Sequence, residues 1–242
     1  MTASFDPPQS CESRARVQSR IDSATLQAGR ERAEVSLLAV SKLQSTAKIE
    51  SLYAAGQRAF GENYVQEAVD KIAALAAKPQ YADIVWHLIG PLQSNKTRVV
   101  AEHFQWVQTV DRLKIAERLS AQRPAHLLPL NICIQVNISG EASKSGCPPD
   151  EALALMVAAS TLPQLLVRGL MGMPEPGIGE AATRQQFLML AALFAQAQSR
   201  ITSVDTLSIG MSDDLEIAVA CGSTMLRVGT ALFGARPVAM NT

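Results

Sequence analysis

The sequence has few of the residues that build metal sites and disulfide-bonded scaffolds. It contains 242 residues but only three histidines and four cysteines, namely Cys11, Cys133, Cys147 and Cys221. The cysteines are widely scattered and none forms a CxxC pair, a pattern typical of free thiols in a reducing compartment. We therefore expect neither a metal site nor a disulfide framework.

An excess of charge and long apolar runs are also lacking. Lysine plus arginine and aspartate plus glutamate each number 22, so the formal net charge is zero, which argues against nucleic acid as a partner. No run approaches the roughly 18–20 apolar residues of a membrane span. Residues 1–9 are polar and rich in proline, unlike a signal peptide. We therefore expect no membrane partner and a cytoplasmic location.

Hydrophobic residues make up 48% of the chain, enough for a sizeable core. We expect residues 1–10 to be disordered, a single domain over residues 11–237, and a short tail over 238–242. A first helix is predicted over 12–28. Beyond it, apolar runs predict strands at 35–42, 58–63, 84–90, 106–110, 130–138, 165–173, 206–211 and 225–233. Helical patterns follow at 45–56, 64–77, 95–103, 112–122, 149–160, 180–200 and 213–220.

Eight strands that alternate with helices predict an α/β protein with parallel strands. Eight such units within about 200–250 residues are typical of a single-domain (β/α)8 TIM-type barrel. The alternative is an open doubly wound sheet, although no GxGxxG follows the first strand. In a barrel the functional residues lie at the carboxyl ends of the strands.

Lys42 ends the first predicted strand and is the first candidate functional residue. Ser36, Leu38, Val40 and Lys42 share one face of that strand, because side chains alternate. A partly desolvated ammonium has a lowered pKa and becomes available for Schiff-base chemistry. The alternative is a lysine that merely extends its amine into water.

The end of the chain carries a candidate phosphate site. The loop Gly210-Met211-Ser212 leads from the seventh strand into a helix, and Gly229 and Thr230 belong to the eighth. Backbone N–H groups and hydroxyls there suit an anion, and barrels frequently hold phosphate after strands seven and eight. Alternatively, Ser212 only caps a helix and Gly229 only packs tightly. A ligand that joins this site to a lysine on strand one needs an aldehyde and a phosphate, as in pyridoxal 5′-phosphate.

The order and spacing of seven motifs resemble the pyridoxal phosphate homeostasis protein family from about residue 12 to 236. The motifs are AVSK (39–42), FGEN (60–63), HLIGPLQSNK (87–96), SKSG (143–146), GLMGM (169–173), SIGMSD (208–213) and RVGTALFG (227–234). The resemblance implies a barrel like the N-terminal domain of alanine racemase, of fold type III among proteins that bind pyridoxal phosphate. It also implies that Lys42 holds the cofactor as an aldimine. The family often has Thr-x-Pro after this lysine, where this chain has Leu43-Gln44-Ser45.

Further roles follow from the same resemblance. It implies that Arg227 faces the pyridine nitrogen, where a guanidinium cannot accept a proton, and that Asn63 bonds the pyridoxal hydroxyl. His87 is either a residue that lines the barrel near the ring or a satisfied core histidine. Lys96 matches a motif position, but a solvated role is equally compatible. Lys144 is a candidate second lysine for cofactor transfer, or part of an exposed loop.

The resemblance favours a carrier without catalytic turnover. Such a protein would buffer pyridoxal phosphate and deliver it to apo-enzymes through transient contacts, and we expect it to be a monomer. The alternative is an amino-acid racemase, which needs a base on each face of its substrate. Alanine racemase takes one such base from a second domain of a partner subunit, and the sequence offers no match to that domain. A purely structural interaction protein would leave Lys42 and the phosphate residues without a purpose.

Overall fold

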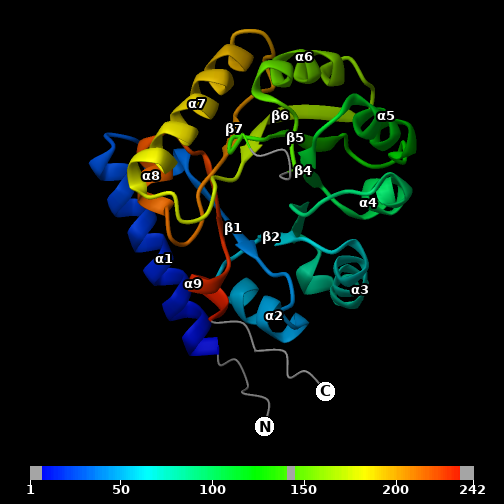
Figure 1. Ribbon diagram of the computed structural model, residues 1–242. Coiled ribbons are helices and arrows are strands. Elements are labelled where there is room, and N and C mark those ends of the chain that lie inside the picture. Colours follow the sequence, from blue (N-terminus) through cyan, green and yellow to red (C-terminus); the bar gives the residue numbers. More distant parts are fainter. Residues whose placement is uncertain (1–6, 141–144, 235–242) are drawn as a thin grey trace, which may run out of the picture.

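The computed structural model describes residues 7–140 and 145–234, which form a closed barrel of parallel strands surrounded by helices (Figure 1). The strands follow one another in chain order and β8 pairs with β1. The predicted (β/α)8 barrel is therefore confirmed and the open sheet is excluded. The strands are β1 (Ser36–Val40), β2 (Ala59–Glu62), β3 (Val85–Leu88), β4 (Trp106–Val110), β5 (Leu130–Val136), β6 (Leu165–Gly172), β7 (Thr206–Ser208) and β8 (Met225–Val228).

A helix follows each strand, as right-handed parallel crossovers require. The helices after β1 to β8 are α2 (Thr46–Ala54), α3 (Val65–Ala76), α4 (Thr97–His103), α5 (Leu113–Gln122), α6 (Pro149–Ser160), α7 (Glu180–Gln198), α8 (Leu215–Ala220) and α9 (Thr230–Phe233). Short 3-10 turns lie at η1 (Arg32–Glu34), η2 (Pro79–Tyr81) and η3 (Ser94–Lys96).

The amino-terminal helix α1 (Pro7–Gln27) completes the outer ring. Helix α9 has only four residues, too few to cover the sheet next to β8. Helix α1 lies against α2, α8 and α9 (Figure 1), and the Ser13 hydroxyl donates to the carbonyl oxygen of Leu232 at 2.9 Å. The expectation that residues 1–10 are disordered is wrong for residues 7–10, because proline is tolerated in a first helical turn. Residues 1–6 and the predicted tail 238–242 lie outside the described residues.

Seven of the eight predicted strands extend beyond their observed carboxyl ends, by one to five residues. The strands expected at 35–42, 206–211 and 225–233 end at Val40, Ser208 and Val228. After Val228 the chain turns into α9, because a short apolar run does not distinguish a strand from a buried helical turn. The residues beyond these strand ends form loops and helix α9 at the carboxyl end of the barrel.

The apolar core has two parts. The larger part fills the space between strands and helices and includes Leu52, Phe60, Leu88 and Phe187, all fully buried. Smaller clusters lie apart from it, one formed by Leu38, Ile89 and Met225 and another by Trp106, Cys133 and Met171. Because side chains alternate along a strand, these smaller clusters lie on the inner face of the barrel.

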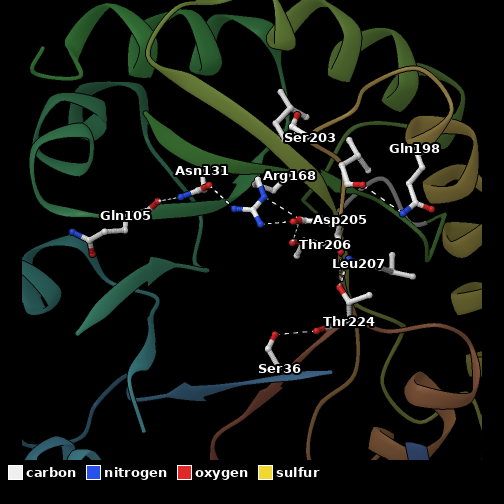
Figure 2. A network of polar contacts seen from close by, with 12 residues as sticks. Ser36, Gln105, Asn131, Arg168, Gln198, Ser203, Asp205, Thr206, Leu207 and Thr224 are labelled. Atoms are coloured by element: carbon white, nitrogen blue, oxygen red, sulfur yellow. Dashed lines mark hydrogen bonds and ion pairs between the residues drawn. The ribbon is translucent and has the colours of Figure 1, made fainter. Parts of the chain in front are cut away.

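A chain of polar contacts joins the amino-terminal ends of neighbouring strands (Figure 2). Arg168 of β6 donates to Asp205 at 2.9 Å and to the side-chain oxygen of Asn131 at 2.9 Å. The Thr224 hydroxyl donates to the Asp205 carbonyl oxygen at 3.2 Å, and the Thr224 carbonyl accepts from the Ser36 hydroxyl at 2.9 Å. These contacts run from β5 to β1 and hold the end of the barrel that usually serves stability.

Above this layer, His87 lies inside the barrel in a satisfied polar network. Its Nδ1 contacts Gln108 Nε2 at 3.0 Å, and its ring stacks on Trp106 with centroids 5.0 Å apart. Ser208 donates to the Gln108 side-chain oxygen at 2.7 Å, and Arg227 donates to the Ser208 hydroxyl at 2.8 Å. Burial lowers the pKa of His87 to about 3. His87 is therefore a neutral core histidine.

Replacing His87 should change how the stability of the fold depends on pH. The unfolded chain binds a proton at this residue near pH 6.5, whereas the folded chain does so only near pH 3. His87 therefore supports the fold fully above pH 6.5, and this support falls by about 2 kcal/mol as the pH drops from 7.5 to 5. Urea unfolding at pH 7.5 and pH 5 measures the free energy of unfolding in the unchanged protein and in His87→Gln. Between these pH values, the free energy should fall less in His87→Gln than in the unchanged protein, by this amount. Equal losses in both proteins would contradict the assignment.

Candidate functional site

A cavity of about 260 Å³ opens at the carboxyl ends of the strands. This end of a barrel usually carries the chemistry, and the volume suits a small ligand. The residues that line it are Val40, Lys42, Gln44, Asn63, Ile89, Met173, Met211, Ser212, Asp213, Arg227, Gly229, Thr230 and Gly234. Seven of the nine residues expected from the sequence are among them, and His87 and Gly210 are not.

Lys42 lies two residues beyond β1, in a turn rather than at the tip of the strand. Val40 lines the cavity below it, and Leu38 belongs to the inner apolar cluster. Leu38 and Val40 thus share one face of β1, as predicted, and that face points into the barrel. The half-buried Lys42 contributes to the cavity wall, so a purely solvated lysine is not what the structure shows.

The loops after β7 and β8 supply further wall residues. Gly229 precedes α9, and a Cβ atom added there would approach Val40 no closer than 3.4 Å, which is an ordinary contact. Packing therefore does not require glycine at this position. Asp214, not Ser212, precedes the first residue of α8. The alternative readings of Ser212 as a cap and of Gly229 as a tight contact are thus both unsupported.

Gly210 has a structural role, and its expected contact with a ligand stays a prediction. Its φ angle is +94°, and an added Cβ atom would lie 2.4 Å from Ala218 Cβ and 2.6 Å from Leu226 Cδ2. Close packing between α8 and β8 therefore requires glycine. His87 is likewise removed from the cavity wall, because its ring is held beneath it by Gln108 and Trp106.

Asn63 offers the cavity a polar atom suited to a ring with a hydroxyl. The side-chain Oδ1 of Asn63 is buried and has no hydrogen-bond partner among the described residues, so it can accept from a ligand. The neighbouring Met211 differs, because its N–H already donates to Asp214 Oδ1 at 2.5 Å. Met211 therefore contributes its side chain rather than its N–H group to the wall.

Arg227 is a buried cation in the cavity floor. Only 4% of it is exposed, and it donates to the Ser208 carbonyl at 2.6 Å and to the Gly172 carbonyl at 2.9 Å. Burial lowers the pKa of its guanidinium to about 10, so the group remains charged near neutral pH. A guanidinium donates hydrogen bonds and accepts none, which makes Arg227 a fixed positive charge beside any ligand.

Other lining residues were not predicted from the sequence, notably Gln44 and Asp213. Gln44 belongs to the segment in which this chain departs from the usual family pattern, and its buried side chain accepts from Lys48 at 2.8 Å. Both positions follow strand ends, which is the signal that could have identified them. Lys96 ends η3 and does not line the cavity. Lys144 lies outside the described residues.

Arg20 of α1 reaches the loop that carries Ser212. Its Nη2 donates to the Ser212 carbonyl at 2.9 Å, and two nitrogens of the same guanidinium contact Glu216 of α8 at 2.8 and 2.9 Å. The hydrogen bond from Arg20 lowers the pKa of the Glu216 carboxyl. The amino-terminal helix therefore fixes the wall of the cavity from outside.

The cavity residues fit pyridoxal phosphate. They combine a lysine amine, two hydroxyls beside a glycine, a fixed cation and a buried acceptor without a partner, which are complementary to its aldehyde, phosphate and ring. No cluster of metal-binding side chains occurs within residues 7–140 and 145–234. In the same ranges, no helix has both the length and the apolar character needed to cross a membrane.

Comparison with known proteins gives a consistent result. Residues 21–237 match the family described as alanine racemase, N-terminal domain. A pyridoxal phosphate homeostasis protein of Pseudomonas aeruginosa is 56% identical over 225 residues, which cover 93% of this chain and 95% of that protein. One of Escherichia coli is 51% identical over 222 residues, covering 92% and 94%. The structure of PipY of Synechococcus elongatus with PLP bound has a TM-score of 0.79 at 38% identity, covering 93% of this chain and 100% of that one.

Removing the Arg20 side chain should weaken anion binding in the cavity. Arg20→Ala leaves the Ser212 carbonyl without its charged donor, and we expect the affinity for inorganic phosphate to fall about threefold, since Arg20 is partly exposed. Isothermal titration with phosphate measures the effect. Arg16→Ala is the matched control, because it removes an exposed arginine from the same helix. Equal affinities in the two variants would show that the contact with Ser212 has no part in binding.

Proposed function

This chain belongs to the pyridoxal phosphate homeostasis protein family, and we propose that it holds pyridoxal phosphate on Lys42, buffers it and delivers it to apo-enzymes. One observation carries the proposal: a single cavity brings Lys42 from the end of β1 together with Ser212, Gly229 and Thr230 from the ends of β7 and β8. These groups are far apart in the sequence but close in space, because β8 pairs with β1.

The chemistry of the cofactor explains why a lysine is needed. Pyridoxal phosphate supplies an aldehyde that condenses with a primary amine and releases water, a link that water can reverse. Lys42 supplies the amine, while the hydroxyls of Ser212 and Thr230 and the backbone at Gly229 bind the phosphate. Charge-assisted hydrogen bonds of this kind contribute about 1.5–3 kcal/mol each. Asn63 accepts a hydrogen bond from the hydroxyl on the ring.

Arg227 favours storage over catalysis. In the proposed arrangement its guanidinium faces the pyridine nitrogen and donates a hydrogen bond to it. Because a guanidinium does not give up its proton, the pyridine nitrogen stays unprotonated and neutral. Its three hydrogen bonds to Ser208 and Gly172 fix it in place. An unprotonated ring withdraws electrons poorly, so it stabilises a carbanion less than a protonated ring does.

An amino-acid racemase remains the second candidate because of Asp213. This carboxylate lines the cavity and could act as a base besides Lys42. It adjoins Ser212, however, and so belongs to the wall assigned to the phosphate. No tyrosine lines the cavity in the described part of the chain. The positions of these residues favour the carrier function over the racemase. We propose further that the protein is a cytoplasmic monomer.

Transfer of the cofactor tests the carrier function. Protein loaded with pyridoxal phosphate and freed of excess ligand should restore activity to an apo-transaminase, as measured by the rate of its own reaction. Lys42→Ala, treated in the same way, should restore much less, because it retains the phosphate site but lacks the amine. Lys96→Ala is the control for loss of a lysine outside the cavity and should transfer like the unchanged protein.

The opposite result would support the racemase. Amino acids incubated with the loaded protein in heavy water would then exchange their α-protons at roughly 1–1,000 per second, as followed by NMR, and the exchange would disappear in Lys42→Ala. Such exchange, together with transfer that does not depend on Lys42, would overturn the carrier proposal.

A further inference from the structure

A buried cluster of charges lies next to the turn that carries Lys42. Glu62 ends β2 with none of its surface exposed, and Lys71 of α3 is almost as deeply buried. Lys71 Nζ lies 2.8 Å from Glu62 Oε1 and 2.6 Å from Glu67 Oε1, one helical turn earlier. The cavity does not include these three side chains, so they have no direct part in binding a ligand there.

The cluster instead contacts the backbone on both sides of Lys42. Lys71 donates to the carbonyl oxygen of Ser41 at 2.8 Å, and the N–H of Leu43 donates to Glu67 Oε1 at 2.6 Å. The Ser41 hydroxyl also donates to Glu62 Oε1 at 2.6 Å. The two peptide groups that flank the Lys42 Cα atom are thus each bonded to a charged group of helix α3.

The conformation of the turn explains why these bonds matter. Leu43 has a φ angle of +60°, a left-handed conformation that is unfavourable for a residue with a Cβ atom. The residue is 55% exposed, so apolar packing contributes little to holding it. The charge-assisted bond from its N–H group to Glu67 offsets this strain.

A purely stabilising role would not require charged residues at this place. Buried ion pairs are often no better for stability than apolar side chains of similar size. Burial raises the pKa of Glu62, opposed mainly by Lys71, and its second oxygen has no hydrogen-bond partner among the described residues. What this arrangement provides beyond stability is a fixed geometry for the turn.

We propose that Glu62, Lys71 and Glu67 are positioning residues that fix the backbone around Lys42 and so direct its amine into the cavity. Lys71 and Glu67 set the two peptide planes, and Glu62 holds Lys71 and Ser41 in place from β2. This inference rests on the proposed function of Lys42 as the residue that bonds the cofactor. It adds that helix α3 determines how readily that bond forms.

The test separates attachment of the ligand from occupancy of the cavity. Stopped-flow absorbance measures the rate at which pyridoxal phosphate attaches to ligand-free protein. Calorimetry measures the affinity for pyridoxine 5′-phosphate, which has the same ring and phosphate but an alcohol in place of the aldehyde. In Glu67→Ala we expect attachment about tenfold slower, since a charge-assisted bond is lost, with unchanged affinity for the alcohol. Glu67→Gln, which retains an acceptor for Leu43, should be slowed about threefold.

One further measurement and a control variant complete the test. The amide hydrogen of Leu43 should exchange with solvent about tenfold faster in Glu67→Ala than in the unchanged protein, as followed by NMR. Glu180→Gln is the matched control, because it breaks an exposed ion pair of the same i,i+4 spacing on α7 and should change neither rate. If Glu67→Ala does not fold, the slower attachment expected of Glu67→Gln carries the same test.

The outcomes distinguish this inference from the proposed function. Attachment to Lys42 at the unchanged rate in both Glu67 variants would overturn the positioning role and leave the carrier function intact. A parallel loss of affinity for pyridoxine 5′-phosphate would also overturn it, because the whole cavity would then depend on the cluster. If the unchanged protein attached pyridoxal phosphate at a residue other than Lys42, the proposed function itself would fail.

Discussion

The pairing of β1 with β8 is the interaction on which the site depends. The two strands are paired from Ser36, opposite Met225, to Ala39, opposite Val228. This pairing closes the barrel and makes the first strand a neighbour of the last. Lys42 and Thr230 are separated by most of the sequence, yet both line one cavity. A lysine and a phosphate site on strands that were not neighbours could not share a ligand as small as pyridoxal phosphate.

Layers of polar side chains follow one another along the axis of the barrel and lie beneath the site. Arg168 and Asp205 hold the strand ends at one mouth, and above them a neutral His87 stacks on Trp106. The next layer contains Arg227, whose charge is retained despite burial. Because each layer satisfies its own polar groups, the cavity above them rests on a rigid floor, as a preorganised binding site requires.

Much of this architecture could be predicted from the sequence because it follows from periodicity. Alternating strand and helix patterns led to the correct barrel, and seven of nine expected residues line the cavity. Sequence patterns are less informative where three-dimensional packing decides. Gly210 is required by its close approach to Ala218 and Leu226, which no sequence pattern reveals, and its contact with a ligand stays a prediction. The start of α1 also differed from expectation, since proline is tolerated in a first helical turn.

The charged cluster beside Lys42 was missed for a related reason. Glu62 lies within a buried strand and Lys71 lies on the apolar face of α3, and a charge in such a position is a signal that the sequence does contain. Its meaning depends on Ser41 and Leu43, which only the fold places against it. Local patterns thus locate the functional lysine, whereas its support comes from residues distant in the chain.

The central claim is that Lys42 bonds the cofactor, and mapping the bond tests it most directly. Pyridoxal phosphate bound to the purified protein is fixed by borohydride reduction, and the modified peptide is identified by mass spectrometry. The account predicts a single modified lysine, Lys42, and loss of the visible absorption of the bound cofactor in Lys42→Ala. Modification at another lysine, with the absorption retained in Lys42→Ala, would contradict it.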